Sequence, residues 1–295
     1  MDWRALGDNF SLRAGLVLMP FGIINQWHEP PIWHGVERPL TDQLIIPTTW
    51  RELGIGAFGS PLGGLLHYEF YLTTTFNPAA FTPGQGLSGG SAEGAFAPAN
   101  GFAVIGRLEI EPILGWVSGF AAYGSESGNN THAYDASGKK LNVSQPIYGY
   151  EFDSRFRRYG VEARIEWANF FLPKAAALLL LHQKDGTLFF PDAATQGAVP
   201  TSIYGGYVEL AYNVLRSLQM TRHQLLPFIR YQIVNTQATT VAGYGGHRED
   251  NIKEATVGIT YRPIQQIAVK TDAQWRFDGN GKQITELDVS LGFMF

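Results

Sequence analysis

Side chains alternate between apolar and charged types from residue 159 to residue 167, and this alternation restricts the fold more than any other feature of the sequence. The odd positions from Tyr159 to Trp167 are apolar or aromatic, whereas the even positions include Glu162, Arg164 and Glu166. Because successive side chains of a strand point to opposite sides, this period of two predicts a strand with one apolar and one charged face. The apolar face would begin and end with an aromatic ring, the two about 20 Å apart at the usual rise and tilt of a barrel strand.

The segment 204–212 repeats this arrangement. Tyr204 and Tyr212 bracket the apolar positions Val208 and Leu210, while Glu209 falls on the opposite face. Aromatic residues at both ends of an apolar face are typical of strands that cross a bilayer, and not of a soluble β-sandwich, whose apolar face packs inward. The predicted aromatic girdles comprise Tyr159, Trp167, Tyr204, Tyr212, Tyr261, Trp275, Phe293 and Phe295.

The composition favours a strand-based membrane protein over a helical one. Charged residues make up 16% of the chain, against roughly 25% in soluble domains. The nearest candidate for a helical span, Ala175–Leu181, is far shorter than the about 18 apolar residues that such a span requires. Since a chain inside a membrane must satisfy its backbone amides internally, we expect a closed β-barrel.

The sequence predicts an all-β fold, a transmembrane antiparallel up-and-down β-barrel that occupies residues 1–295 as a single domain. Short links alternate with long Gly-, Asn- and Pro-rich stretches such as 77–101 and 125–154, as in bacterial barrels with short periplasmic turns and long outer loops. The segment 174–184 has two interpretations, a strand or a short buried helix, and we count it as a strand. About twelve strands are predicted, near residues 10–19, 50–59, 64–75, 102–111, 114–124, 156–168, 174–184, 201–213, 225–236, 253–263, 266–276 and 284–295.

The two ends of the sequence carry further signals. Apolar residues occupy the odd positions from Leu287 to the terminal Phe295, a pattern similar to the C-terminal signal that the barrel-assembly machinery recognises in outer-membrane proteins. The first residues, beginning with Met1 and Asp2, contain no apolar segment of a secretory signal. We therefore interpret the start as that of a mature, trimmed or truncated chain.

The stretch from Arg13 to Gly59 is the most distinctive part of the sequence. It contains a strand end AGLVLMPFG, a loop with HEPP and a re-entry IIPTTWRELG. These motifs resemble the phosphate-selective porin family, the porin O and P type of Gram-negative outer-membrane proteins, and the other strands resemble it only in pattern. The resemblance implies a general or anion-favouring diffusion channel, often trimeric. Further strands usually precede this stretch in the family, so the complete barrel is expected to hold more than twelve.

The predicted inward faces carry both signs of charge. Unopposed arginines would concentrate phosphate by charge and bidentate hydrogen bonds, but interleaved carboxylates pair with them and cancel much of the field. We therefore expect passive diffusion of small hydrophilic solutes or ions with weak charge selectivity. The predicted pore-lining residues are Arg13, His67, Glu69, Arg107, Glu109, Glu162, Arg164, Glu166, Glu209, Arg230, Arg262, Lys270, Asp272, Arg276, Glu286 and Asp288.

The loop with the HEPP motif is predicted to fold into the lumen and form the constriction, because its Pro-Pro pair stiffens it and its ionisable groups would meet any passing ion. The alternative is a loop packed outside, against a neighbouring subunit, through Trp27 and Trp33. The Pro-Pro break also removes the spacing of a helical zinc site, so no metal site is predicted. The constriction residues are His28, Glu29, His34, Glu37 and Arg38.

Two other classes of function stay open. An outer-membrane hydrolase needs a nucleophile beside a histidine; His67 and Glu69 share a strand face, and His247 and Glu249 share a loop, yet neither pair has an evident nucleophile. A plugged structural or adhesive barrel would act through its long loops.

We predict no enzyme activity and no cofactor. The net charge of −4, without blocks of like charge, argues against nucleic-acid binding. The expected location is the outer membrane of a Gram-negative bacterium. The expected partners are outer-membrane lipid and lipopolysaccharide, the barrel-assembly machinery, and small solutes or inorganic ions, and the family resemblance implies a homotrimer.

Overall fold

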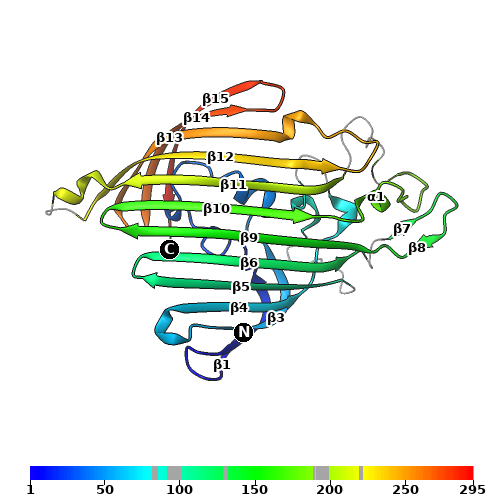
Figure 1. The fold of residues 1–295 in the computed structure, drawn as a ribbon, viewed down its shortest axis with the longest axis horizontal. Coiled ribbons are helices and arrows are strands. Elements are labelled where there is room, and N and C mark those ends of the chain that lie inside the picture. The colour runs from blue at the N-terminus through cyan, green and yellow to red at the C-terminus, as the bar shows by residue number, and fades with distance from the viewer. Residues whose placement is uncertain are drawn as a thin grey trace.

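The computed structural model describes residues 1–81, 86–91, 101–128, 132–188, 190, 199–218 and 222–294 of the chain. Antiparallel strands dominate it (Figure 1). The strands are β1 (Asp2–Arg4), β2 (Ser11–Leu18), β3 (Arg51–Gly59), β4 (Leu66–Thr73), β5 (Phe102–Ile113), β6 (Trp116–Ser127), β7 (Ala133–Tyr134), β8 (Lys140–Leu141), β9 (Gln145–Arg158), β10 (Val161–Phe171), β11 (Pro200–Tyr212), β12 (Gln224–Thr240), β13 (Asn251–Ile264), β14 (Ile267–Phe277) and β15 (Gln283–Phe293).

The helices are all short. They are η1 (Pro30–Ile32), η2 (Thr41–Ile45), η3 (Leu62–Gly64), η4 (Pro78–Ala80), η5 (Ser88–Gly90), α1 (Ala175–Leu178), η6 (Val214–Ser217) and η7 (Arg248–Asp250). None of the described helices is long and apolar enough to cross a membrane.

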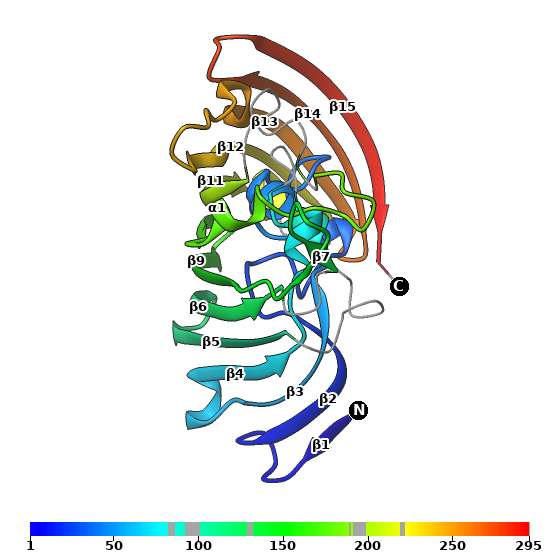
Figure 2. The ribbon, with the colours of Figure 1, turned by 90° about the vertical axis from the view of Figure 1, so that its right-hand side faces the viewer.

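One sheet of 13 strands contains every described strand except β7 and β8, which form a separate hairpin. Each strand of the large sheet pairs with the next one along its order, and the described registers are antiparallel throughout, as between β9 and β10 and between β13 and β14. The sheet curves into an arc from β1 to β15, with loop segments inside the curve (Figure 2). In the described part of the chain β1 and β15 are the two edges of this sheet. The predicted all-β, antiparallel, up-and-down architecture is confirmed.

The connections differ in length at the two ends of the strands. One end, here called the turn end, has connections such as 60–65, 114–115, 159–160 and 265–266. The other, the loop end, has connections such as 19–50, 74–101, 128–144 and 172–199. The predicted alternation of short and long connections is therefore present.

The outer face of the sheet is apolar and exposed. On β10, Ile165 is 43% exposed, whereas the neighbouring Glu162 on the inner face is 6% exposed. Soluble monomers rarely expose continuous apolar surface of this extent, so the outer face suits contact with hydrocarbon. Exposed apolar side chains that continue this pattern include Leu53, Ile55, Phe70, Leu72, Val104, Leu108, Phe120, Phe152, Val208, Leu210, Ile229, Val257, Ile259, Val269, Leu287, Val289 and Leu291.

The aromatic residues that bracket β10 and β11 lie at two levels. Toward the loop end the rings of Trp167 and Tyr204 stack, with centroids 5.3 Å apart and planes inclined by 15°. Gly206 makes room for this stack, because a Cβ atom there would lie 2.5 Å from the Trp167 ring. At the turn end Tyr159 and Tyr212 are 60% and 47% exposed. Of the other predicted girdle residues, Phe293 is exposed, Tyr261 and Trp275 are half-buried, and Phe295 lies outside the described residues.

The prediction of one strand over 156–168 is wrong. Two strands, β9 and β10, meet there in a tight turn in which Tyr159 and Gly160 have φ angles of 58° and 85°. Most of β9 lies in the segment 125–154 that we assigned to a loop. Tyr159 therefore brackets β10 from the turn. Inward side chains are at odd positions in β9, such as Asp153, and at even positions in β10, such as Glu162, so the alternation shifts by one residue at the turn. The adjacent charges of Arg157 and Arg158 blur this shift in the sequence.

The prediction of a strand over 174–184 is also wrong. Residues Ala175–Leu178 form α1, and the side chains of Ala175, Leu178, Leu179 and Leu181 are buried. Consecutive Ala and Leu have high helix propensity and no polar alternation, so burial on the inside of the sheet decides in favour of a helix. The strands β1, β7, β8 and β9 were not predicted, and the predicted strand over 174–184 is absent. The described strands therefore exceed the predicted twelve.

The inner face of the sheet has two parts. Its part at the loop end, here called the apolar half, carries buried residues of β2, β4, β5, β6, β9, β10, β11 and β12, which contact residues such as Phe76 and Leu178 of the connections in one hydrophobic cluster. Its part at the turn end, here called the charged half, carries buried Arg, Lys, Glu and Asp. The sheet residues of this cluster are Val17, Tyr71, Ala103, Ile105, Ala121, Tyr123, Ile147, Ala168, Phe170, Ile203 and Val234.

Candidate functional site: a loop packed on a charged inner wall

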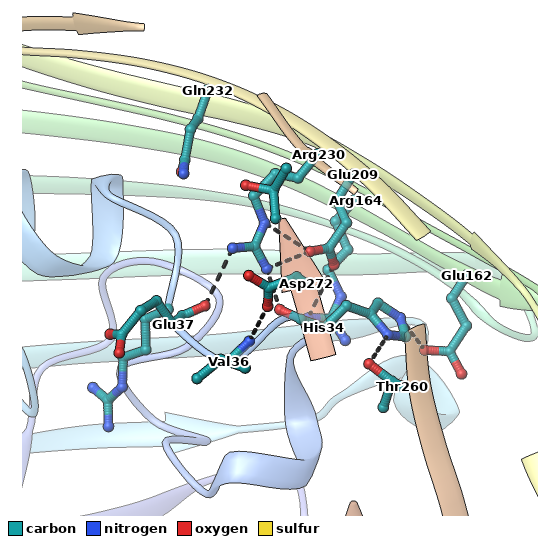
Figure 3. Close-up of polar contacts among 12 residues, drawn as sticks. His34, Val36, Glu37, Glu162, Arg164, Glu209, Arg230, Gln232, Thr260 and Asp272 are labelled. Carbon is teal, nitrogen blue, oxygen red and sulfur yellow. Dashed lines mark hydrogen bonds and ion pairs between the residues drawn. The ribbon is translucent and has the colours of Figure 1, made fainter. Parts of the chain in front are cut away.

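The connection between β2 and β3, residues 19–50 and here called the inner loop, lies inside the curve of the sheet. Its helix η2 contacts β10, β11 and β12, and its helix η1 contacts β14 and β15. It therefore packs on the inner faces of strands far from it in the sequence. Figure 3 shows side chains from those strands directed at residues 34–37 of this loop.

His34 is fully buried between two strands. Its Nε2 lies 3.1 Å from a carboxylate oxygen of Glu162 on β10, and its Nδ1 lies 3.4 Å from the hydroxyl of Thr260 on β13 (Figure 3). Burial lowers the pKa of His34 below its usual value, against the opposing effect of the Glu162 carboxylate. A neutral imidazole suits both contacts, because Nε2–H can donate to Glu162 while Nδ1 accepts from the hydroxyl.

Arg230 of β12 connects the inner face of the sheet, here called the inner wall, to the backbone of the inner loop. Its guanidinium donates to Glu209 of β11 at 2.6 and 2.8 Å, to the carbonyl of Glu37 at 3.2 Å and to the carbonyl of His34 (Figure 3). A planar guanidinium with several donors suits this bridging of a carboxylate and two carbonyls. Gly35, with φ +80°, lies between these contacts, and a Cβ atom there would be 3.3 Å from Asp272.

Four more wall residues bind the loop backbone. Asp272 accepts from the amide of Val36 at 2.6 Å, and Gln232 accepts from the amide of Leu40 at 2.8 Å. Lys270 donates to the carbonyl of Pro30 at 2.6 Å, and Arg164 donates to the carbonyl of Ile32. Since these bonds reach main-chain groups, they fix the path of the loop rather than the identity of its side chains.

Acidic groups crowd the other side of the loop. A Cβ atom on Gly22 would lie 2.8 Å from a carboxylate oxygen of Glu166 and 3.3 Å from one of Asp42. The backbone amide of Ile24 approaches the Asp42 carboxyl, but among the described residues neither carboxyl oxygen has a well-aligned hydrogen bond. Burial raises the pKa of Asp42 to about 7, although Arg38 and Arg230 oppose the shift. Protonation lets this carboxyl lie beside Glu166 without two uncompensated charges.

A separate ion-pair network lies on β5 and β9. Arg107 contacts Glu151 at 2.7 Å, Glu109 at 2.8 Å and Asp153 at hydrogen-bonding distance. Arg155 binds Glu109 as well. The interleaved signs that we inferred for the inward faces therefore pair with one another in space.

The predicted pore-lining residues divide into covered and accessible groups. Arg164 has a side-chain exposure of only 12%. The accessible group comprises Arg13, His67, Glu109, Arg276, Glu286 and Asp288. The buried group, which lies largely beneath the inner loop or in ion pairs, comprises Glu69, Arg107, Glu162, Glu166, Glu209, Arg230, Arg262, Lys270 and Asp272.

The predicted constriction residues have different surroundings. His34 is buried, Glu37 is exposed, and His28, Glu29 and Arg38 are half-buried. Arg38 donates to the carbonyl of His28 at 3.2 Å and lies over the ring of Trp33, which Lys270 also approaches. Trp33 thus packs inside the curve, and Trp27 is exposed. No group of three or more His, Cys, Asp or Glu among the described residues has an arrangement that could hold a metal ion.

His67 has a hydroxyl partner that we did not find in the sequence. Its Nδ1 lies 2.8 Å from Oγ of Ser60 in the turn between β3 and β4, and its Nε2 lies 3.4 Å from Glu69. Glu69 also accepts from Gln26 at 2.7 Å and from the hydroxyl of Tyr71 at 2.8 Å. Ser60 precedes His67 by a full turn and the start of a strand, so no motif of fixed spacing could reveal the contact.

Comparison of the sequence with known proteins finds no matching family model. An uncharacterized protein of Aquifex aeolicus (strain VF5) is 29% identical over 265 residues, which cover 89% of this chain and 57% of that protein. The chain thus spans little more than half the length of this relative.

Two solved structures of outer-membrane proteins resemble the fold. The outer membrane channel DcaP of Acinetobacter baumannii gives a TM-score of 0.52 at 11% identity, over 97% of this chain and 72% of that chain. The Salmonella typhi OmpF complex with daunomycin gives a TM-score of 0.57 at 14% identity, over 97% of this chain and 74% of that chain. The chain therefore has the fold of outer-membrane channel proteins.

Proposed function

We propose that the protein is an outer-membrane porin, a passive diffusion channel for small hydrophilic solutes or ions. The observation that carries this proposal is the opposition of the two sheet faces. Ile165 and its equivalents expose an apolar outer face, while the inner face holds ion pairs and a loop. Only a wall between hydrocarbon and an aqueous interior gives both faces a suitable solvent.

The solute path in this proposal runs between the inner loop and the accessible part of the inner wall. Arg13 near one sheet edge, with a side-chain exposure of 32%, and Glu286 and Asp288 near the other offer charges to water. We propose that further strands complete the wall between β1 and β15, in agreement with the greater length of the Aquifex relative. The inner loop narrows the path and its neighbouring charges give weak selectivity.

The finer assignments follow from this proposal. The outer face would contact lipid and lipopolysaccharide of a Gram-negative outer membrane, and the barrel-assembly machinery would insert the protein. A homotrimer is the proposed assembly. Strong selectivity for phosphate is not part of the proposal, because Arg107, Arg230 and Arg262 each contact a carboxylate.

Single-channel conductance of the full-length protein in a planar bilayer, with reversal potentials in a salt gradient, tests the proposal. We expect stepwise ohmic currents. In a gradient of a salt whose cation and anion have equal mobility, we expect a reversal potential near zero. A variant lacking residues 28–37 should conduct more per channel, because the narrowing segment is absent. Insertion without any current, in both proteins, would refute the channel.

An outer-membrane hydrolase is the second candidate, favoured by one observation. Ser60, His67 and Glu69 form a continuous hydrogen-bonded series, as a nucleophile, base and orienting acid would. The channel remains the better proposal, because Gln26 and Tyr71 engage Glu69 as ordinary wall partners. Ester hydrolysis that is present in the natural protein, lost in Ser60→Ala and retained in the control Ser118→Ala would favour the hydrolase instead.

A further inference from the structure

A cavity of about 460 Å³ opens at the turn end of the inner face. One side consists of inner-loop residues and the other of residues of β5, β6, β9 and β10, near the turns at 114–115 and 159–160. Its volume is in the range of sites that hold small organic molecules. The contacts that hold the loop by Arg230, Lys270 and Asp272 lie outside this cavity.

The loop side of the cavity is apolar. Ile23, Trp27 and Ile32 line it, and Val117 of β6 continues the same surface. Ile23 is buried among other apolar residues, but Trp27 is 59% exposed. An exposed indole beside a cavity offers a flat surface on which a hydrocarbon or aromatic group can stack.

The wall side carries three arginines and two glutamates, namely Arg155, Arg157, Arg164, Glu109 and Glu162. Both glutamates already have several cationic partners. Glu109 contacts Arg107 and Arg155, and Glu162 contacts Arg157, Arg262 and His34. Arg155 and Arg164 are in turn shared with Asp153 and Glu209 outside the cavity. The positive charge left to the cavity is therefore that of Arg157.

Arg157 supplies the accessible part of this charge. Its Nε lies 3.2 Å from Glu162, and its side chain is 60% exposed. Among the described residues no hydrogen bond or ion pair is found for its two terminal nitrogens. Those nitrogens form the planar, two-donor edge that matches a carboxylate.

We propose that this cavity binds small amphiphilic carboxylates, with the carboxylate at Arg157 and the hydrocarbon body against Trp27. Such a ligand places each of its parts against a surface of matching polarity. An inorganic anion would leave the apolar side unused, and a neutral hydrocarbon would leave Arg157 unused. That permeating solutes use this cavity as a binding site along their path rests on the proposed channel function. The binding itself does not rest on it.

Calorimetric titration of the full-length protein in detergent, with benzoate as the probe, tests the inference. We expect Arg157→Gln to weaken benzoate binding about tenfold or more, since it removes a charge-assisted pair. Trp27→Ala should weaken benzoate and leave acetate unchanged. Arg158→Gln is the matched control, because that neighbouring side chain lies over the Tyr159 ring and does not line the cavity.

Two results would overturn the inference: equal affinity of Arg157→Gln and the natural protein for benzoate, or binding of benzyl alcohol as tight as that of benzoate. Conductance measured in parallel separates the two proposals. A protein that conducts but does not bind benzoate refutes only the site. A protein that binds benzoate with the expected variant pattern but never conducts supports the site and refutes the channel.

Discussion

The two halves of the inner face hold the same loop by different forces. In the apolar half, Trp50 of the loop lies among the rings of Phe76, Tyr123 and Phe170, with centroids 5.0, 5.2 and 6.3 Å away. In the charged half, residues 30–37 are held by hydrogen bonds from wall side chains such as Arg230 and Lys270. The ends of the loop, with Met19 and Trp50, are thus packed, and its middle is held by hydrogen bonds.

This difference separates stability from position. Apolar burial is favourable without precise geometry, so the apolar half should supply most of the free energy that holds the loop. Buried ions lose hydration, which offsets most of their attraction, but a wrongly placed loop would leave them unpaired. The charged half should therefore specify where the loop lies. Four predictions test this division, in order of decreasing effect.

The largest effect is expected from Trp50→Ala in the apolar half. Trp50 is 1% exposed, and removing its ring leaves a cavity that should lower the free energy of unfolding by about 3–5 kcal/mol. Thermal or denaturant unfolding in detergent measures it. Trp27→Ala is the control, because its exposed ring should cost under about 1 kcal/mol. Equal losses in the two variants would contradict the division.

Arg230→Met should come next. It leaves the buried Glu209 with Arg164 at 3.7 Å as its remaining ion-pair partner, which should cost about 3 kcal/mol. It should also free the loop carbonyls, so that a glutamate-specific protease cleaves faster after the exposed Glu37. The double variant Arg230→Met, Glu209→Met should recover most of the stability but not the loop position. Recovery of slow cleavage in the double variant would contradict a positioning role.

The pH dependence of loop binding forms the third prediction. Burial raises the pKa of Asp42 from 3.8 to about 7, so the protein with the loop in place binds a proton that the released loop does not. The stability from this group is present below pH 4 and is lost as pH rises to about 7. Asp42→Asn should gain roughly 1–3 kcal/mol at pH 8 and nothing at pH 4.

His34 changes stability in the opposite direction. Burial lowers its pKa from 6.5, so the released loop takes up a proton first and stability falls as pH drops below about 6.5. His34→Gln should remove this acid-side loss. Unfolding midpoints of the natural protein and of both variants between pH 4 and pH 8 measure the two effects. Variants whose midpoints change with pH in the same way as that of the natural protein would contradict them.

The smallest effect is expected from Glu286→Gln on β15, where no inner-loop residue covers the side chain in the described structure and the residue is exposed. Its stability should change by less than about 0.5 kcal/mol. The reversal potential in a salt gradient should shift slightly toward anions, since one accessible negative charge is lost. Val289→Thr on the outer face is the control, because it changes no lumen charge. A shift toward cations in Glu286→Gln would contradict the proposed path.

The strands that alternate most clearly were predictable, and those with a hidden reversal or no alternation were not. The local sequence alone shows which side chains share a face in the segment around Tyr204 and Tyr212 and in the segment around Val257 and Ile259. This is because an extended chain places every second side chain on the same face. The turn at Tyr159 and Gly160 shifts the inward positions from odd to even, but the adjacent charges of Arg157 and Arg158 blur that shift in the sequence. The helix at Ala175 depends on contacts from distant loops.

The sequence by itself determined the class of fold and the two faces, because each strand repeats its polarity over neighbouring residues. Only the tertiary structure decided what the inner charges contact. Lys270 reaches Pro30 across 240 positions, and Arg230 reaches His34 across 196. The alternation of an inward face is the same whether water or a loop covers it, so the path of the inner loop depends on shape and charge brought together by folding.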